Sequence, residues 1–236
     1  MDQLNVFKEI VLGRRSIRKF KPIQVPESII HECLDLAMLA PNSSNLQPWE
    51  FYWVKSHDKK AKLAEYCMNQ SAARTASDLI VFVSRPDHWK QGQKLNLEQI
   101  DKNDPKQKDF IKYYTQIVPL AYSTDSFGIL KVIKTIVSFL TGMFKVSYRG
   151  PFGKSGNLLW ATKTTSLAAE NFMLAIHAAG YDSCPMEGFD QRRVKKLLEL
   201  PCDAYVSMVI GVGEQDVGGL YGPRFRGPRD LFVKIV

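Results

Sequence analysis

The sequence predicts a single domain that combines helices with short strands. At 236 residues the chain is long enough to bury one large core, and its 45% hydrophobic and 24% charged residues are ordinary for a folded globular protein. Segments with an apolar residue every three or four positions alternate with short runs of β-forming residues. No repeat, low-complexity tract or linker separates them, so we expect one domain over residues 1–236.

Helices and strands are expected in alternation along the chain, and glycine or proline marks the ends of the helices. The predicted helices cover residues 4–12, 26–40, 59–77 and 164–179. A further short helix follows Asp190, which can cap it. The predicted strands, rich in β-branched and aromatic residues, cover residues 50–55, 79–84 and 204–213. Residues 85–119 are polar and lysine-rich, and there we expect helix and loop.

Residues 126–148 carry an unusual mixture of apolar residues and lysines. Ile133, Ile136 and Phe139 belong to an apolar face that three lysines interrupt, and Gly142 breaks the pattern. The simplest interpretation is a helix that packs on its own domain. The alternatives are a lid that shapes an acceptor pocket and an interfacial segment that makes weak contact with a membrane.

The net charge of +8 comes from 32 basic and 24 acidic residues and favours an anionic partner. The basic residues are spread along the chain without a run of five or six, whereas nucleic-acid-binding proteins more often concentrate them. A solvated surface explains most of the lysines. Nucleic acid is therefore not the partner we expect, while a phosphate-bearing cofactor and an acidic membrane surface fit the charge.

The four cysteines, Cys33, Cys67, Cys184 and Cys202, form no C-x-x-C pair and no metal-ligand pattern with the four histidines. We expect buried free thiols, no metal site and a cytoplasmic location. The N-terminus lacks the design of a signal peptide, and no apolar stretch approaches the roughly 18 residues that cross a bilayer. The histidines have no partner in the sequence, so we expect them to be structural or solvated rather than catalytic.

Three stretches carry polar groups suited to holding a ligand. Residues 14–18 place three arginines and a serine within five positions, and arginine offers permanently charged donor pairs for phosphate. Residues 40–49 pack amide and hydroxyl groups between two prolines, and residues 180–190 contain glycines that permit close approach to a ligand. Taken singly, the stretches also fit a solvated turn, a helix-to-strand loop and a helix-to-helix connection.

Together the three stretches resemble motifs of the nitroreductase family. Arg14, Ser16, Arg18 and Phe20 fill the pattern R-x-S-x-[RK]-x-F. The pattern A-P-S-S-x-N-x-Q-P-W is matched, apart from Asn42 in place of its first serine, by Ala40, Pro41, Ser43, Asn45, Gln47, Pro48 and Trp49. A third pattern, G-x-x-x-x-P-[IM]-x-G-F, is matched by Gly180, Pro185, Met186, Gly188 and Phe189. Arg224 and Arg226 supply a final basic pair, so the motifs span residues 2–229 in the family order.

The resemblance implies an α+β fold, with a central mixed, mainly antiparallel sheet flanked by helices, in an intertwined homodimer. It also implies two FMN molecules at the dimer interface. The residues implied in FMN binding are Arg14, Arg15, Ser16, Arg18, Pro41, Asn42, Ser43, Asn45, Asn69, Pro185, Met186, Glu187, Gly188, Arg224 and Arg226. The tail over 227–236 is β-prone around Phe232, and we expect it to embrace the partner subunit.

The resemblance also implies distinct roles within this set. The arginines of 14–15 and 224–226, with Ser16, would hold the FMN phosphate. Arg18 and Asn69 would face the pyrimidine edge of the ring, where a cation stabilises negative charge on the reduced flavin. Backbone amides of 187–188 would reach the ring near its hydride-accepting nitrogen, and residues 41–45 would come from the other subunit.

One position departs from the resemblance. Several family members have a lysine three residues after the asparagine matched by Asn69, and this chain has Ala72 there. Arg74 is a candidate substitute for the missing cation. The departure bears on the redox tuning of the flavin more than on its binding.

The activity implied by the resemblance is a two-step transfer of electrons from NADH or NADPH to a small organic acceptor, nitroaromatic or quinone-like. The flavin carries the chemistry, so no catalytic side chain is expected. A dehalogenase, an enone reductase or an azoline oxidase on the same scaffold would share every flavin residue. A non-enzymatic basic protein that binds nucleic acid or membrane is the remaining alternative.

Overall fold

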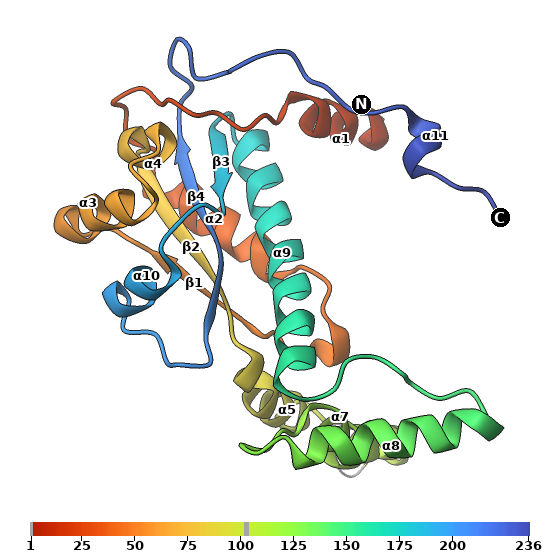
Figure 1. Cartoon of the computed structure of the whole chain (residues 1–236). Helices are drawn as coiled ribbons and strands as arrows, with labels where there is room; N and C mark the ends of the chain where they lie inside the picture. The colour runs from red at the N-terminus through yellow and green to blue at the C-terminus, as the bar shows by residue number, and fades with distance from the viewer. Residues whose placement is uncertain (1, 102–103) are drawn as a thin grey trace.

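The computed structural model describes residues 2–101 and 104–236, which form one sheet with helices on both faces (Figure 1). The strands are β1 (Trp49–Trp53), β2 (Asp78–Ser84), β3 (Asp182–Met186) and β4 (Tyr205–Gly213). The α-helices are α1 (Gln3–Gly13), α2 (Glu27–Met38), α3 (His57–Tyr66), α4 (Ser71–Thr75), α5 (Trp89–Glu98), α6 (Lys108–Lys112), α7 (Val118–Tyr122), α8 (Ile129–Phe144), α9 (Gly153–Ala178), α10 (Gln191–Leu197) and α11 (Arg229–Phe232). Short helical turns are η1 (Ser43–Asn45), η2 (Pro86–His88), η3 (Pro105–Gln107) and η4 (Tyr113–Ile117).

The four strands pair antiparallel in the order β1-β2-β4-β3. The central strands β2 and β4 are almost wholly buried, which explains why both appear in the sequence as continuous apolar runs. A single parallel bridge joins Ser16 to Ser183 at the outer edge of β3. The expected α+β fold with a mixed, mainly antiparallel sheet is therefore confirmed.

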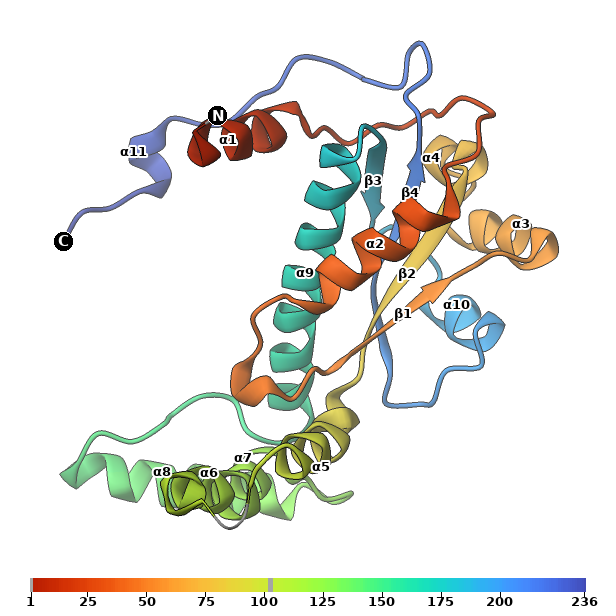
Figure 2. The same cartoon turned by 180° about the vertical axis from the view of Figure 1, so that it is seen from behind.

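One face of the sheet is covered by α2 and by the 26-residue α9 (Figure 2). Small residues on α9, among them Ala168 and Ala169, are fully buried and let α2 approach closely. Phe172 meets Phe82 of β2 with ring centroids 5.4 Å apart, an arrangement that contributes beyond simple area burial. This layer fixes the direction of α9, and a separate group of elements lies at each end of this helix.

The opposite face of the sheet is covered by α3, α4 and α10. Leu63 of α3 and Val194 of α10 are fully buried against the strands. Asp190 accepts a hydrogen bond from the backbone N–H of Arg193, 3.0 Å away, and so caps α10 as predicted. The helices on this face hold the turn after β3 and the turn between α3 and α4 beside each other.

Two groups of elements extend from the opposite ends of α9 (Figures 1 and 2). At one end lie α1 and the C-terminal tail with α11, and at the other end lie α5 to α8. None of the residues of α1 is buried, and Leu4, Phe7 and Leu12 are more than half exposed. Among the described residues no helix is both long and apolar enough to cross a membrane.

Several sequence predictions of secondary structure are confirmed, and several are wrong. The strands predicted at 50–55, 79–84 and 204–213 are present as β1, β2 and β4, and every strand end agrees with the prediction within two residues. The stretch 180–190, for which a helix-to-helix connection was one alternative, contains β3, a strand that was not predicted. The isolated sequence hides this strand because Pro185 is unusual in a ladder, and only an edge position makes it acceptable.

The helix boundaries also differ from the prediction in three places. Residues 59–77 form two helices, because Met68 and Asn69 adopt left-handed φ values of 58° and 51° that end α3. The helix predicted from residue 164 begins at Gly153. The β-prone tail forms the single turn α11, so its strand character is not realised.

The predicted helix and loop over 85–119 are present in its described part, and residues 102–103 lie outside the described residues. Gly142, which was expected to break a helical pattern, lies inside α8. Cys33, Cys67 and Cys184 are buried free thiols, whereas Cys202 is exposed because it lies in the turn before β4. Burial raises the pKa of Cys67 to about 12, so this thiol stays protonated at neutral pH.

Candidate functional site

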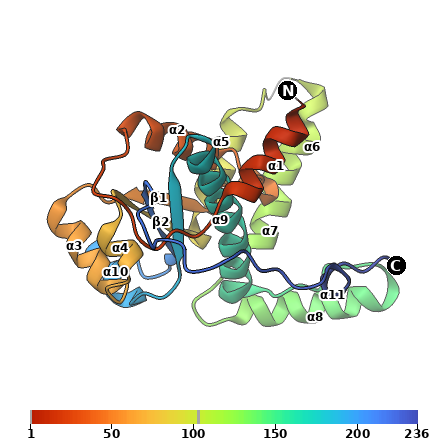
Figure 3. The ribbon, with the colours of Figure 1, turned by 90° about the horizontal axis from the view of Figure 1, so that it is seen from above.

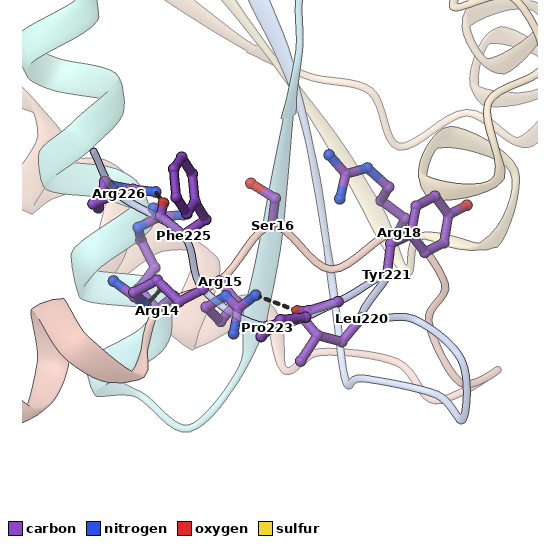
Figure 4. A pocket seen from close by; sticks show the side chains of 11 residues that line it. Arg14, Arg15, Ser16, Arg18, Leu220, Tyr221, Pro223, Phe225 and Arg226 are labelled. Carbon is purple, nitrogen blue, oxygen red and sulfur yellow. Dashed lines mark hydrogen bonds between the residues drawn. The ribbon is translucent and has the colours of Figure 1, made fainter. Parts of the chain in front are cut away.

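A cavity of about 240 Å³ lies between two segments that are more than 200 residues apart in sequence. Five arginines line it: Arg14, Arg15, Arg18, Arg224 and Arg226. The remaining lining residues are Ser16, Leu220, Tyr221, Gly222, Pro223 and Phe225. Figure 4 shows Ser16 in the middle of this set, with Arg14 and Arg226 on one side and Arg18 with Tyr221 on the other. We call this the arginine cavity.

Arg224 holds the C-terminal segment onto the end of α1. Its Nη2 donates hydrogen bonds of 2.7 Å to the carbonyl oxygens of Leu12 and Arg14, and Nη1 lies 3.3 Å from the carbonyl oxygen of Val11. A helix leaves its last carbonyls without partners inside the helix, and a cation at this end is stabilised by the helix dipole. Arg224 is therefore a cap for α1 as well as a wall of the cavity.

Two further contacts tie the same segments together. Arg15 donates a 2.7 Å hydrogen bond from Nη2 to the carbonyl oxygen of Gly222. The guanidinium carbon of Arg18 lies 4.9 Å from the centre of the Tyr221 ring, a cation–π arrangement. The backbone N–H of Arg18 also donates to the carbonyl oxygen of Gly219, 2.7 Å away. The arginine cavity is thus a constructed feature and not a loose basic turn.

The positive charge of the arginine cavity is not neutralised by its own lining. No acidic side chain lines the cavity, and Nη1 of Arg14 is buried without a hydrogen-bond partner among the described residues. Loss of hydration, followed by the charges of Arg15, Arg226 and Arg14, lowers the pKa of Arg224 from its ordinary value. An anion with several acceptor oxygens would satisfy the free donor and remove this repulsion.

Ser16, which lines the cavity, lies beside the outer edge of β3. The backbone N–H of Ile17 donates to the carbonyl oxygen of Ser183, 3.1 Å away, which sets Ser16 beside the start of the strand. Ser183 Oγ is buried and also lacks a partner among the described residues. Burial raises the pKa of the Cys184 thiol, while the nearby charges of Arg18 and Arg14 act in the opposite direction. The positive charges of Arg14 and Arg18 therefore also act on side chains of β3.

The far end of β3 brings five more predicted residues close to one another. Pro185 and Met186 end the strand, and Glu187 and Gly188 follow as an exposed turn. Gln70 donates a 2.8 Å hydrogen bond from Nε2 to the carbonyl oxygen of Gly188, which places the exposed Asn69 next to this turn. The left-handed backbone of Asn69, uncommon outside glycine, is strain of the kind that gathers at functional sites.

The structure does not bring Pro41, Asn42, Ser43 and Asn45 to the arginine cavity of the same chain. Their loop, the orange turn after α2 in Figure 2, lies at the end of α9 that carries α5 to α8. Ser44, which lies between them, bonds Tyr113 of η4 at 2.6 Å, and Asn45 bonds Asn96 of α5 at 3.0 Å. Left-handed φ values at Ser44, Asn45 and Gln47 make this a strained, tightly held loop.

The departure at residue 72 has a structural explanation. The Ala72 side chain is only 2% exposed and belongs to the core beneath α4. A lysine at this position would have to carry its charge out of that core. Arg74, the candidate substitute, is exposed on the same helix.

Sequence reasoning missed residues that the structure places at the site. Tyr221, Gly222 and Phe225 line the arginine cavity, and Gln70 supports the turn after β3. Tyr221 and Gly222 lie just before the basic pair of the final motif, and Phe225 lies between its two arginines. Aromatic residues this close to the arginines were the signal that could have identified this segment. Gln70 had none, because its role depends on a residue 118 positions away.

The titratable side chains outside the arginine cavity form no metal centre among the described residues. No group of three or more His, Cys, Asp and Glu side chains in residues 2–101 and 104–236 could hold a metal ion. Of the histidines, His88 lies 3.4 Å from Glu50 beside the Arg85 ion pairs, and His177 lies 3.9 Å from Asp182. His57 is almost fully exposed. These positions fit structural and solvated histidines.

Comparisons with known proteins identify relatives over nearly the whole chain. The model of the Nitroreductase family matches residues 11–214. Protein DrgA of Synechocystis is 26% identical over 211 residues, covering 88% of this chain and 83% of that protein. A protein named NADH dehydrogenase from Thermus thermophilus is 25% identical over 206 residues, covering 87% and 85%. A structure from Exiguobacterium sibiricum, solved in complex with FMN, has a TM-score of 0.72 and 25% identity and covers 98% and 97%.

The role of Arg224 as a helix cap leads to a stability prediction. Arg224→Ala removes the donors from three carbonyl oxygens at the end of α1, and we expect the free energy of unfolding to fall. The measurement is urea unfolding at fixed protein concentration. Arg226→Ala is the matched control, since its described hydrogen bond is to the neighbouring Phe225, and we expect a change within about 0.5 kcal/mol. Equal losses in both variants would contradict the capping role.

Proposed function

Because the chain belongs to the Nitroreductase family, we propose that it is an FMN-dependent oxidoreductase that passes electrons from NADH or NADPH to a small organic acceptor. The arginine cavity is the observation that carries this proposal. Five guanidiniums, a serine hydroxyl and a buried donor without a partner match the needs of a dianionic phosphate. The FMN bound by the relative from Exiguobacterium sibiricum supports the choice of cofactor.

When bound, FMN supplies the chemistry that relays electrons between a reduced nicotinamide and an acceptor, and the protein supplies binding and orientation. Arg14, whose Nη1 has no partner among the described residues, would hold the phosphate, and Ser16 and Arg15 would add donors from the same turn. Arg226 contributes charge from the opposite wall. Arg224 acts mainly by fixing that wall, since its Nη atoms are engaged with α1.

The remaining residues orient the ring and tune its charge. Arg18 is exposed beside Tyr221, and from there its charge would stabilise negative charge on the pyrimidine edge of the reduced ring. Asn69 would face the same edge. The hydrogen bond from Gln70 to Gly188 fixes the exposed turn at 187–188, whose backbone amides would approach the ring near its reacting nitrogen.

The site is completed in a homodimer. The loop over 41–45 lies away from the arginine cavity of its own chain, at the other end of α9, so only a second subunit can bring such a loop to it. The helix α1 and the tail are the surfaces suited to this contact, because Phe7, Leu12, Phe232 and Ile235 are exposed. The tail over 227–236 then embraces the partner subunit.

The physiological acceptor is a nitroaromatic or quinone-like molecule in this proposal. A dehalogenase, enone reductase or azoline oxidase would use the same flavin residues, so the acceptor has to be tested separately. A non-enzymatic basic protein that binds nucleic acid needs no constructed cavity of this kind. A colourless protein whose DNA binding weakens steeply with salt would favour this nucleic-acid-binding alternative.

An anaerobic absorption spectrum tests the function directly. We expect yellow protein whose flavin bands bleach on addition of NADH or NADPH and return on addition of a quinone or a nitroaromatic compound. Bands that bleach but return only with a halogenated substrate or an enone would move the protein to a specialised reaction. Protein that neither contains nor binds FMN would overturn the proposal.

The arginine cavity makes a sharper prediction about phosphate recognition. Arg14→Gln removes the buried donor and its charge, and we expect FMN to bind about 10-fold to 100-fold more weakly. Riboflavin lacks the phosphate, so its affinity should change by less than about three-fold. The measurement is fluorescence titration of the apoprotein with each flavin. Arg192→Gln, on the exposed side of α10, is the matched control and should leave both affinities unchanged. An equal loss of affinity for FMN and riboflavin would show that Arg14 does not contact the phosphate.

A further inference from the structure

One amide side chain fastens the loop between α2 and β1 to α5. Nδ2 of Asn96 donates hydrogen bonds of 2.7 Å to the carbonyl oxygens of Asn45 and Gly92. Oδ1 of Asn96 accepts from Nδ2 of Asn45 at 3.0 Å and from the hydroxyl of Tyr114 at 3.1 Å. An amide has two donor hydrogens and two acceptor lone pairs, so the hydrogen-bonding capacity of Asn96 is fully used.

Gly92 lets the same loop lie directly against α5. A Cβ atom added to Gly92 would lie 2.3 Å from the carbonyl oxygen of Leu46 and 2.7 Å from its Cα atom. Both atoms belong to the backbone, so they could not move aside without displacing the loop. Leu46 is 1% exposed and forms a small separate core with Trp89 and Tyr114. Close packing therefore anchors the loop in addition to the hydrogen bonds.

The turn η4 adds contacts from a second element. The hydroxyl of Tyr114 also lies 3.0 Å from the carbonyl oxygen of Ser44, so its hydrogen is shared between the loop and Asn96. The neighbouring Tyr113 bonds the hydroxyl of the same Ser44. The turn η4 is a π-helical turn, a rare widening of a helix that is frequent at functional sites. Two consecutive tyrosines of this turn thus contact one loop residue.

These contacts stabilise a loop conformation that is costly by itself. Ser44, Asn45 and Gln47 have φ values of 59°, 48° and 48°, a region that residues other than glycine seldom adopt. In this conformation the side chains of Pro41, Ser43 and Asn45 are exposed. These three residues belong to the set that the proposed function assigns to the FMN of the other subunit. The contacts with α5 and η4 therefore determine which side chains the loop offers to a second copy.

The arrangement around α9 suits such an exchange between two copies. Figure 3, a view from the α1 end of α9, shows α1 at the near end and α6 and α7 at the far end on the same side of this helix. The loop lies on that side too (Figures 1 and 2). In the proposed homodimer, a half-turn about an axis across α9 exchanges the two ends, so the loop of each chain meets the arginine cavity of the other.

The uncovered face of α8 agrees with the same half-turn. Ile133, Ile136 and Phe139 are 49%, 53% and 61% exposed, so the expectation that this face packs on its own domain is wrong for the described chain. Because α8 lies at the same end of α9 as the loop, the homodimer brings this face toward the exposed apolar residues of the partner's α1 and tail.

We propose that Asn96, supported by Gly92 and Tyr114, is a positioning residue for FMN in the partner subunit. This inference rests on the proposed function and assigns a role in it to α5 and η4. The two carbonyl oxygens bound by Asn96 can only accept, so its Nδ2 faces them and its Oδ1 faces the amide nitrogen of Asn45. Asn45 thereby keeps its own Oδ1, together with the exposed Ser43, for the flavin of the second copy.

Fluorescence titration of the apoprotein with FMN tests the proposal. Asn96→Ala removes the contacts of the amide, Asn96→Asp sets an oxygen against two carbonyl oxygens, and Gly92→Ala displaces the loop. Each should weaken FMN binding by about 10-fold to 100-fold. Gln91→Ala removes an exposed amide from the same helix and is the matched control, which should leave the affinity unchanged. Circular dichroism establishes that each variant folds.

Mixed dimers show in which subunit Asn96 acts. Two affinity tags select dimers that pair an Arg14→Gln chain with an Asn96→Ala chain. Because each loop serves the partner's cavity, both defects fall in one site, and the other site should bind FMN with unaltered affinity. A dimer that pairs a chain carrying both substitutions with an unaltered chain should instead have two weakened sites and no unaltered one.

The opposite pattern, with an unaltered site in the second mixed dimer alone, would assign Asn96 to the cavity of its own chain and overturn the proposal. Equal weakening of every site in both mixed dimers would show a merely structural role. Unchanged FMN affinity in Asn96→Ala, or an unaltered chain that binds FMN as a monomer, would also contradict the proposal. These results leave the proposed function standing. An unaltered chain that binds no FMN overturns the proposed function, and this inference with it.

Discussion

Five guanidinium groups share one cavity without an acidic side chain in its lining, and this unneutralised charge governs how the two ends of the chain are arranged. Arginines so close together repel one another unless carbonyl oxygens or an anion compensate them. Arg224 and Arg15 find carbonyl oxygens, and in doing so they fasten the C-terminal segment to the end of α1. Arg14 Nη1 is buried without a hydrogen-bond partner among the described residues, and on this ground we propose that the cavity binds an anion.

Much of the fold and the phosphate side of the site could be predicted from the sequence, because the relevant signals are local. Continuous apolar runs identified β2 and β4, and Asp190 identified the start of α10. The arginines at 14–18 and 224–226 are recognisable as a family pattern, and the structure brings both groups to one cavity. Each of these features depends on residues that are neighbours in sequence.

Features that depend on distant residues could not be predicted in the same way. The strand β3 exists because its edge position tolerates Pro185 and pairs with β4. Gln70 supports Gly188 only once two helices and a strand are in place. For α8, the sequence shows an amphipathic helix but not which side faces the protein. Contacts from Tyr148 and Ser123 decide that the polar side is the inner one.

Phosphorus NMR of FMN bound to the protein tests the central role of the arginine cavity most directly. Free phosphate monoesters titrate near pH 6, where they gain a proton and lose one negative charge. Guanidiniums that surround the phosphate stabilise its dianion and lower its pKa. The bound phosphate should therefore keep an unchanged chemical shift from about pH 7 to about pH 5, with Arg14→Gln restoring part of the titration. A bound phosphate that titrates as in free FMN would show that the cavity does not hold it.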